Sequence, residues 1–119
     1  MGALPPPLSQ LLAAPVLRSE LPAGFNGAFV FPRAAAPRYH IIGGAEVEFA
    51  GPSGTAFVSY ELFRTGAEAQ AFARRHAGGS RRVQSRSLRR FAVVASGATH
   101  ARAVALLRAA VAHLRRVER

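Results

Sequence analysis

The sequence contains no cysteine, no lysine and no long apolar run in its 119 residues. The absence of cysteine excludes disulfides, thiolate nucleophiles and cysteine-ligated metal sites. No segment approaches the roughly 20 consecutive apolar residues of a membrane-spanning helix. The N-terminus has no basic region, and its apolar residues are interrupted by Pro5, Pro6, Pro7 and Pro15, which is not the pattern of a signal peptide. We therefore expect a cytoplasmic location, or an extracytoplasmic one if the chain is the trimmed form of a longer protein.

The positive charge comes from arginine alone. All sixteen basic residues are arginine, against six acidic residues, and the formal net charge is +10. The lack of lysine indicates a coding bias toward arginine, which accounts for part of this excess. Residues 1–60 nevertheless carry three arginines and three glutamates, whereas residues 61–119 carry thirteen arginines and three glutamates. An excess confined to one half of the chain predicts a negatively charged partner.

The clearest local pattern is a β-hairpin. Residues 45–50 and residues 55–63 both alternate between apolar and polar side chains. The segment between them, Gly51-Pro-Ser-Gly54, places proline and glycine where a type I turn accepts them. Two β-patterned runs around such a turn predict a hairpin in which Ala50 faces Thr55.

Two further segments have the pattern of helices. In residues 65–77, Thr65 stands at the start and Glu68 follows three positions later, which is the spacing of a capping box. Residues 99–119 begin with Thr99, and their apolar residues repeat at spacings of three and four. Both segments are therefore expected to present one apolar face to a core.

The remaining pattern fixes the expected fold class. Residues 81–96 resemble one strand, most clearly at "FAVVA". With the hairpin and the helices, they predict an α+β fold, a two-layer sandwich with a mostly antiparallel sheet of about four strands and helices packed on one face. Residues 1–15 are expected to form a proline-rich arm with a short helix, and residues 16–119 a single α+β domain.

Three segments carry a family resemblance: "SELPAGF", "VSYELFRTGAEAQAF" and "FAVVASGATHARAVALLRAAVAHLRR". Together they resemble small α+β domains of high-GC actinobacteria, among them extracytoplasmic lipoprotein and sensor-type domains of unassigned function. The likeness covers residues 16–117. It implies the same fold class and supplies no catalytic residues, and this chain lacks the cysteines often found in such domains.

The predicted hairpin register separates two faces. Ala45, Val47 and Phe49 share one apolar face, which should lie under the helices. The other face and its end carry polar and aromatic side chains, and these are the candidate binding residues: His40, Glu46, Glu48, Phe57, Ser59, Glu61 and Phe63. Glu46 and Glu61 become diagonal neighbours, so a positive group is expected to offset their repulsion.

Three interpretations of this face stay open. In the first, Arg82, Arg86 and Arg90 alternate onto one side of the 81–96 strand and pair with the glutamates across an exposed sheet face. In the second, the face binds a ligand or a second subunit. In the third, Glu46 and Glu61 form a catalytic carboxylate pair.

Residues 74–90 hold seven arginines and no acidic residue. Those at the end of the predicted helix are stabilising without a partner. The candidate anion-binding residues follow on the next loop and strand: Arg81, Arg82, Arg86, Arg89 and Arg90. Binding of single-stranded nucleic acid also needs aromatic residues among the charges, and only Phe91 lies nearby. An arginine-rich edge strand would also prevent edge-to-edge aggregation.

The sequence contains none of the motifs that usually mark a metal site, a phosphate-binding loop or a hydrolase active site. The four histidines, His40, His76, His100 and His113, have no metal-ligand spacing, and no phosphate-binding loop or hydrolase elbow occurs. The sequence therefore indicates no metal, no cofactor and no catalytic residue. It favours a small non-enzymatic binding domain that contacts a second copy or another protein through the open sheet face. The alternative is a basic protein that binds nucleic acid or another polyanion through Arg81–Arg90.

Overall fold

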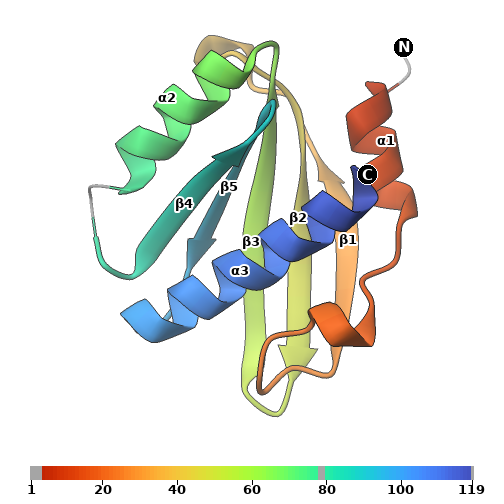
Figure 1. The fold of residues 1–119 in the computed structure, drawn as a ribbon, viewed down its shortest axis with the longest axis vertical. Coiled ribbons are helices and arrows are strands. Elements are labelled where there is room, and N and C mark those ends of the chain that lie inside the picture. The colour runs from red at the N-terminus through yellow and green to blue at the C-terminus, as the bar shows by residue number, and fades with distance from the viewer. Residues whose placement is uncertain (1–3, 78–79, 119) are drawn as a thin grey trace.

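The computed structural model describes residues 4–77 and 80–118 and places them in one antiparallel sheet with three α-helices (Figure 1). The helices are α1 (Pro6–Ala13), α2 (Gly66–Ala77) and α3 (His100–Val117), and two short 3-10 helices are η1 (Arg18–Glu20) and η2 (Pro37–Tyr39). The strands are β1 (Gly27–Arg33), β2 (Ile41–Gly51), β3 (Gly54–Phe63), β4 (Val83–Leu88) and β5 (Phe91–Ser96). The α+β class is confirmed. In the described part of the chain, no helix combines the length and apolarity that crossing a membrane requires.

The strand order is β1-β2-β3-β5-β4, and every neighbouring pair is antiparallel. The predicted hairpin is confirmed with its register, because Ala45 pairs with Tyr60 and Val47 with Val58. The register shifts once, between Ile41 and Gly43. A bulge at that point bends the strand where it enters the sheet.

The sheet has five strands rather than about four. The segment Gly27–Arg33 forms the edge strand β1. Residues 81–96 are two strands and not one, because a two-residue turn at Arg89 and Arg90 folds β5 back onto β4. Arg89 takes a left-handed backbone with φ of 54°. Glycine or asparagine usually marks such a turn, so an arginine there left no signal in the sequence.

The helices lie on both faces of the sheet. One core cluster joins α1 and α3 to the face that carries Tyr60 and Phe91, and α3 crosses this face obliquely (Figure 1). A second cluster joins α2 to Phe63 and Ala92, which alternate with Leu62 and Phe91 and so point the other way. The expectation of all helices on one face is therefore wrong for α2. Within the proline-rich segment, α1 begins at Pro6 and buries Leu8 in the core.

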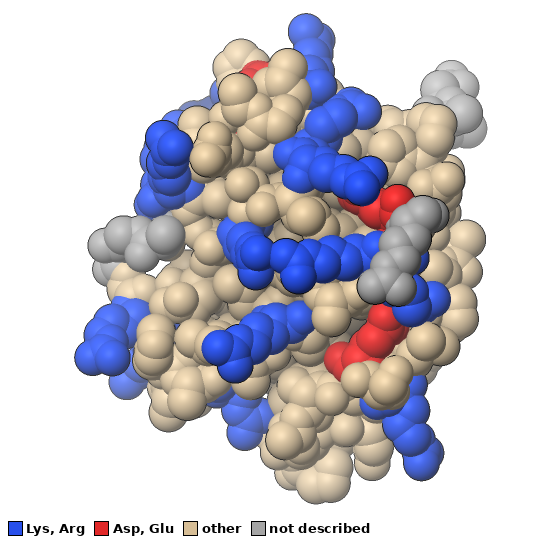
Figure 2. All heavy atoms as spheres, in the orientation of Figure 1, with Lys and Arg blue, Asp and Glu red and all other residues tan. Residues whose placement is uncertain are grey.

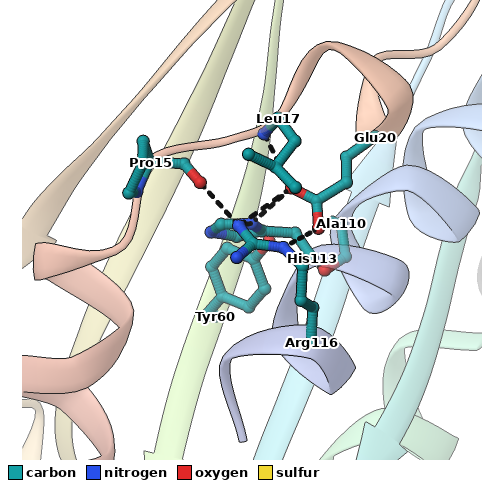
Figure 3. A network of polar contacts seen from close by, with 7 residues as sticks. All are labelled: Pro15, Leu17, Glu20, Tyr60, Ala110, His113 and Arg116. Atoms are coloured by element: carbon teal, nitrogen blue, oxygen red, sulfur yellow. Dashed lines mark hydrogen bonds and ion pairs between the residues drawn. The ribbon is translucent and has the colours of Figure 1, made fainter.

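A buried polar cluster fastens the N-terminal segment to α3 (Figure 3). The Arg116 Nε donates to Glu20 Oε2 at 2.6 Å, and the His113 Nδ1 lies 3.0 Å from Glu20 Oε1. The backbone N–H of Leu17 donates to Glu20 Oε1 at 2.8 Å. An ionised carboxylate can only accept, so the Nδ1 of His113 carries the proton. We call Glu20, His113 and Arg116 the Glu20 cluster. Beside it, the Tyr60 hydroxyl donates to the Ala110 carbonyl at 2.9 Å.

The Glu20 cluster lowers the pKa of its carboxyl. Burial alone would raise this pKa, but the hydrogen bonds from Arg116, Leu17 and His113 outweigh burial and bring it to about 2. The unfolded chain therefore binds the proton more tightly than the folded chain. The stability that Glu20 contributes is present above its ordinary pKa of 4.5 and is lost as the pH falls toward 2.

We predict that substituting Glu20→Gln flattens the acid limb of the stability profile. Between pH 5 and pH 2 the unmodified chain should lose about 3 kcal/mol more unfolding free energy than the variant, as a shift of this size implies. Urea unfolding at each pH measures this difference. The Glu68→Gln variant is the control, because its carboxylate lies outside the cluster, and it should follow the unmodified chain. Parallel profiles for the unmodified chain and Glu20→Gln would contradict the assignment.

Candidate interaction surface

The second face of the sheet is only partly covered. Helix α2 packs over β4 and β5, where the Ser85 hydroxyl donates to the carbonyl of Ala73. The part formed by β1, β2 and β3 carries side chains that alternate with the core residues, and we call it the open face. Its residues are Phe29, Phe31, Arg33, Glu46, Glu48, Phe57 and Ser59, with Glu61 at its buried edge.

One row of the open face places an acid between two exposed rings. Phe29 pairs with Glu48 across β1 and β2, and Glu48 pairs with Phe57 across β2 and β3. Phe29 is 66% exposed and Phe57 is 45% exposed, while Glu48 is half-buried. Two large apolar side chains this exposed on either side of one acid make this row a candidate contact site.

Another row holds the charge cluster of the face. Arg33, Gly44 and Glu61 lie side by side on three neighbouring strands. Because Gly44 has no side chain, the Arg33 guanidinium reaches across β2 to Glu61, with an N–O distance of 3.3 Å. The same guanidinium lies 3.6 Å from Glu46. Arg33 therefore offsets the repulsion between the two glutamates.

Glu61 is the carboxylate most affected by this arrangement. It is 8% exposed. Burial raises the pKa of Glu61, the charge of Glu46 raises it further, and Arg33 acts in the opposite direction. A carboxyl shared with an arginine and largely removed from water is typical of a structural charge pair. Neither Glu46 nor Glu61 is left without a cationic partner.

Two of the predicted face residues lie elsewhere. Phe63 is 1% exposed and packs against Phe72 of α2, with ring centroids 5.2 Å apart. It therefore belongs to the second core cluster. His40 stands beyond η2 with a left-handed backbone, and its Nδ1 lies 3.5 Å from Glu68 of α2. The alternation of β3 was read correctly, but the position of α2 was not visible in it.

The arginines of residues 81–90 do not form one patch. Arg81 and Arg82 lie before β4, whereas Arg89 and Arg90 lie in the turn after it, at the other end of a strand of about 20 Å. The Arg89 Nε pairs with Glu118 at 3.4 Å, and the Arg90 Nε donates to the Phe63 carbonyl at 2.9 Å. Arg86 alone projects from the middle of β4, opposite Val93 on the α3 side.

The predicted pairing of these arginines with the open-face glutamates is wrong. Strand β5 lies between β3 and β4, and Arg86 points to the opposite face from Glu46 and Glu61. Arg33 takes their place. The sequence predicts a loop at residues 32–38 and leaves residues 16–31 open between a strand and an irregular segment, although Phe29, Phe31 and Arg33 alternate with smaller residues. A proline at position 32 is compatible only with an edge strand, and that position was the signal that was missed.

No metal site accompanies the open face. Within residues 4–77 and 80–118, no group of three or more histidine or acidic side chains is placed to hold an ion. The oxygens of Glu46 and Glu61 instead face a guanidinium. The face therefore offers two exposed rings, one carboxylate without a counter-ion among the described residues, and a neutralised charge pair beside them.

We predict that Gly44→Ala destabilises the fold, because an added Cβ would lie 2.8 Å from the Tyr60 carbonyl oxygen and 3.0 Å from Glu61 Oε2. Overpacking of this kind costs about 1–3 kcal/mol. The matched control is Gly27→Ala on β1, where an added Cβ meets nothing within 4 Å. Urea unfolding should separate the two variants, and equal stability would show that the close approach at Gly44 has no energetic consequence.

Comparisons with known proteins add no family to this description. No family model matches the chain, and neither do the curated proteins or the solved structures with which it was compared. The resemblance to actinobacterial domains stays a prediction. Functional conclusions therefore rest on the open face and on the other surfaces of the fold.

Proposed function

We propose that this protein is a non-enzymatic binding domain whose open face receives a cationic side chain of a partner protein. One observation carries the proposal, namely the row in which Glu48 lies between Phe29 and Phe57. Both rings are exposed. No arginine or histidine of the described residues forms an ion pair with Glu48.

The row has the chemistry that recognises a guanidinium. Strands β1 and β3 are separated by β2, so the two ring-bearing positions lie roughly 10 Å apart. This spacing leaves room for one planar cation between the rings. A guanidinium stacks on aromatic faces and pairs with a carboxylate through two parallel hydrogen bonds. An arginine of the partner can therefore contact both rings and the carboxylate at once.

The arginine of the open face, Arg33, cannot move between Phe29 and Phe57 without breaking its other contacts. Arg33 lies on the same face but is held by Glu46 and Glu61. That pairing also argues for binding rather than catalysis. An acid–base pair needs a carboxylate free to exchange a proton with substrate, and both glutamates share one guanidinium.

A basic partner fits the open face better than a symmetric second copy does. A two-fold axis brings the same patch of two subunits together. Such a contact would place two acidic patches near each other, and like charges oppose association. A partner that supplies arginine meets the exposed acid with complementary charge. We keep the homodimer as an alternative that the oligomeric state of the protein can test.

We predict that a fluorescein-labelled peptide of alternating arginine and glycine binds the full chain and that Glu48→Gln weakens this binding about tenfold. The loss of one charge-assisted pair of about 1.4 kcal/mol corresponds to that factor. Fluorescence anisotropy at near-physiological salt measures it, because screening then limits the repulsion from the distant arginines. Phe57→Ala should weaken binding in the same direction.

The matched control is Glu68→Gln, which removes the same charge from α2 and keeps the capping hydrogen bonds to Thr65 possible. It should bind the peptide as the unmodified chain does. Equal losses in Glu48→Gln and Glu68→Gln would contradict the proposal, as would the absence of saturable binding. A dimer of the unmodified chain that Phe57→Glu converts to monomer would favour the second copy instead.

A further inference from the structure

We propose a second binding surface, on the face that α3 covers, which contacts the phosphate backbone of double-stranded nucleic acid. This surface is separate from the open face and lies on the opposite side of the sheet. We call it the arginine face and define it by Arg86 of β4 and by Arg108 and Arg115 of α3. All three side chains are exposed.

The solvent side of α3 is a ridge of small residues and arginines. After the exposed His100 at its start, the exposed positions of the helix recur at spacings of three and four: Ala101, Ala105, Arg108, Ala112 and Arg115. The two arginines are seven positions apart, which places them about 10 Å from each other along one side of the helix. The alanines between them allow a partner's backbone to approach closely while the two guanidinium groups reach outward.

Positive charge dominates the whole of this face. Figure 2 shows arginines spread over the face that α3 crosses, with acidic residues visible only in small areas at the upper edge and in the right half of the view. The glutamates that adjoin α3 already form ion pairs within the fold, because Glu20 pairs with Arg116 and Glu118 pairs with Arg89. In residues 4–77 and 80–118, the three arginines of the arginine face form no ion pair. Their charge therefore remains available to an external anion.

The same surface identifies the kind of polyanion. A helix that binds a membrane surface presents tryptophan, phenylalanine or leucine to the lipid, whereas the exposed ridge of α3 holds only alanine and arginine. Single-stranded nucleic acid stacks its bases on aromatic side chains. The exposed aromatic residues among those described, Phe29, Tyr39 and Phe57, do not lie on α3 or β4. A duplex requires neither feature, because its phosphates alone can be bound by arginine forks.

The test is fluorescence anisotropy of a labelled 20-base-pair DNA duplex titrated with the full chain at several salt concentrations. One variant combines Arg86→Gln, Arg108→Gln and Arg115→Gln. We expect the unmodified chain to bind in the micromolar range at 50 mM salt and the variant to bind at least tenfold more weakly. The slope of log affinity against log salt should also fall by about 2–3, because each lost phosphate contact removes about 0.9.

The matched control combines Arg38→Gln, Arg64→Gln and Arg74→Gln. These exposed arginines lie on η2, the β3–α2 link and α2, so net charge falls equally while the arginine face is kept. The control should lose less than about threefold. Exposed substitutions usually change stability little, and circular dichroism checks that both variants are folded.

Several outcomes would overturn the proposal. Equal losses in the two triple variants would mean that binding follows net charge and not this face. The absence of duplex binding at 50 mM salt would show that the arginine face does not bind double-stranded nucleic acid. Tighter binding of a single strand, or binding of vesicles rich in phosphatidylserine without binding of the duplex, would assign the arginines to a different partner. Phe57→Ala should leave duplex binding unchanged, which separates this proposal from that for the open face.

Discussion

The register of β1, β2 and β3 is the constraint on which both faces of this protein depend. Because side chains alternate along a strand, a one-residue slip of β2 would move Ala45, Val47 and Phe49 out of the core and bring the glutamates into it. The observed register buries the apolar set under α1 and α3. The same register places Glu48 between two exposed rings and places Gly44 between Arg33 and Glu61.

The fold also separates charge between its two sides. Three of the six glutamates lie at positions 46, 48 and 61, on the open side of the sheet, and a single arginine of β1 holds two of them. On the other side, Glu20 and Glu118 are paired within the fold, so that the exposed surface is left to arginine. A basic chain of this kind can therefore present an acidic, aromatic surface and a basic surface at the same time. Complementary partners for the two surfaces differ in kind, which makes their binding separable by mutation.

The local parts of the structure were predictable from the sequence because local chemistry determines them. The turn at Gly51–Gly54 fixed the hairpin register, and alternation from that turn placed Glu46, Glu48 and Phe57 on one face. Thr65 and Glu68 form the capping contacts that their spacing predicted. Thr99 caps α3 by accepting from the backbone N–H of Arg102 at 3.1 Å.

The parts that were missed depend on contacts between distant segments. Arg33 pairs with Glu61 only because β1 joins the far edge of the hairpin, and Glu20 meets Arg116 across 96 positions of sequence. The turn at Arg89 has a left-handed backbone without the residue that usually marks it. Helix α2 packs on the face opposite to α1 and α3 because Phe63 and Ala92 supply an apolar area there. Sequence periodicity does not reveal which face of a sheet a helix covers.

The central claim is that the open face, and not the whole charged surface, receives a cationic partner. The most direct measurement is a map of amide chemical-shift changes in the 15N-labelled chain as an arginine–glycine peptide is added. The account predicts that the changes concentrate on β1, β2 and β3 around Phe29, Glu48 and Phe57, and that they saturate. Changes scattered over the molecule, or centred on α2 or α3, would contradict it.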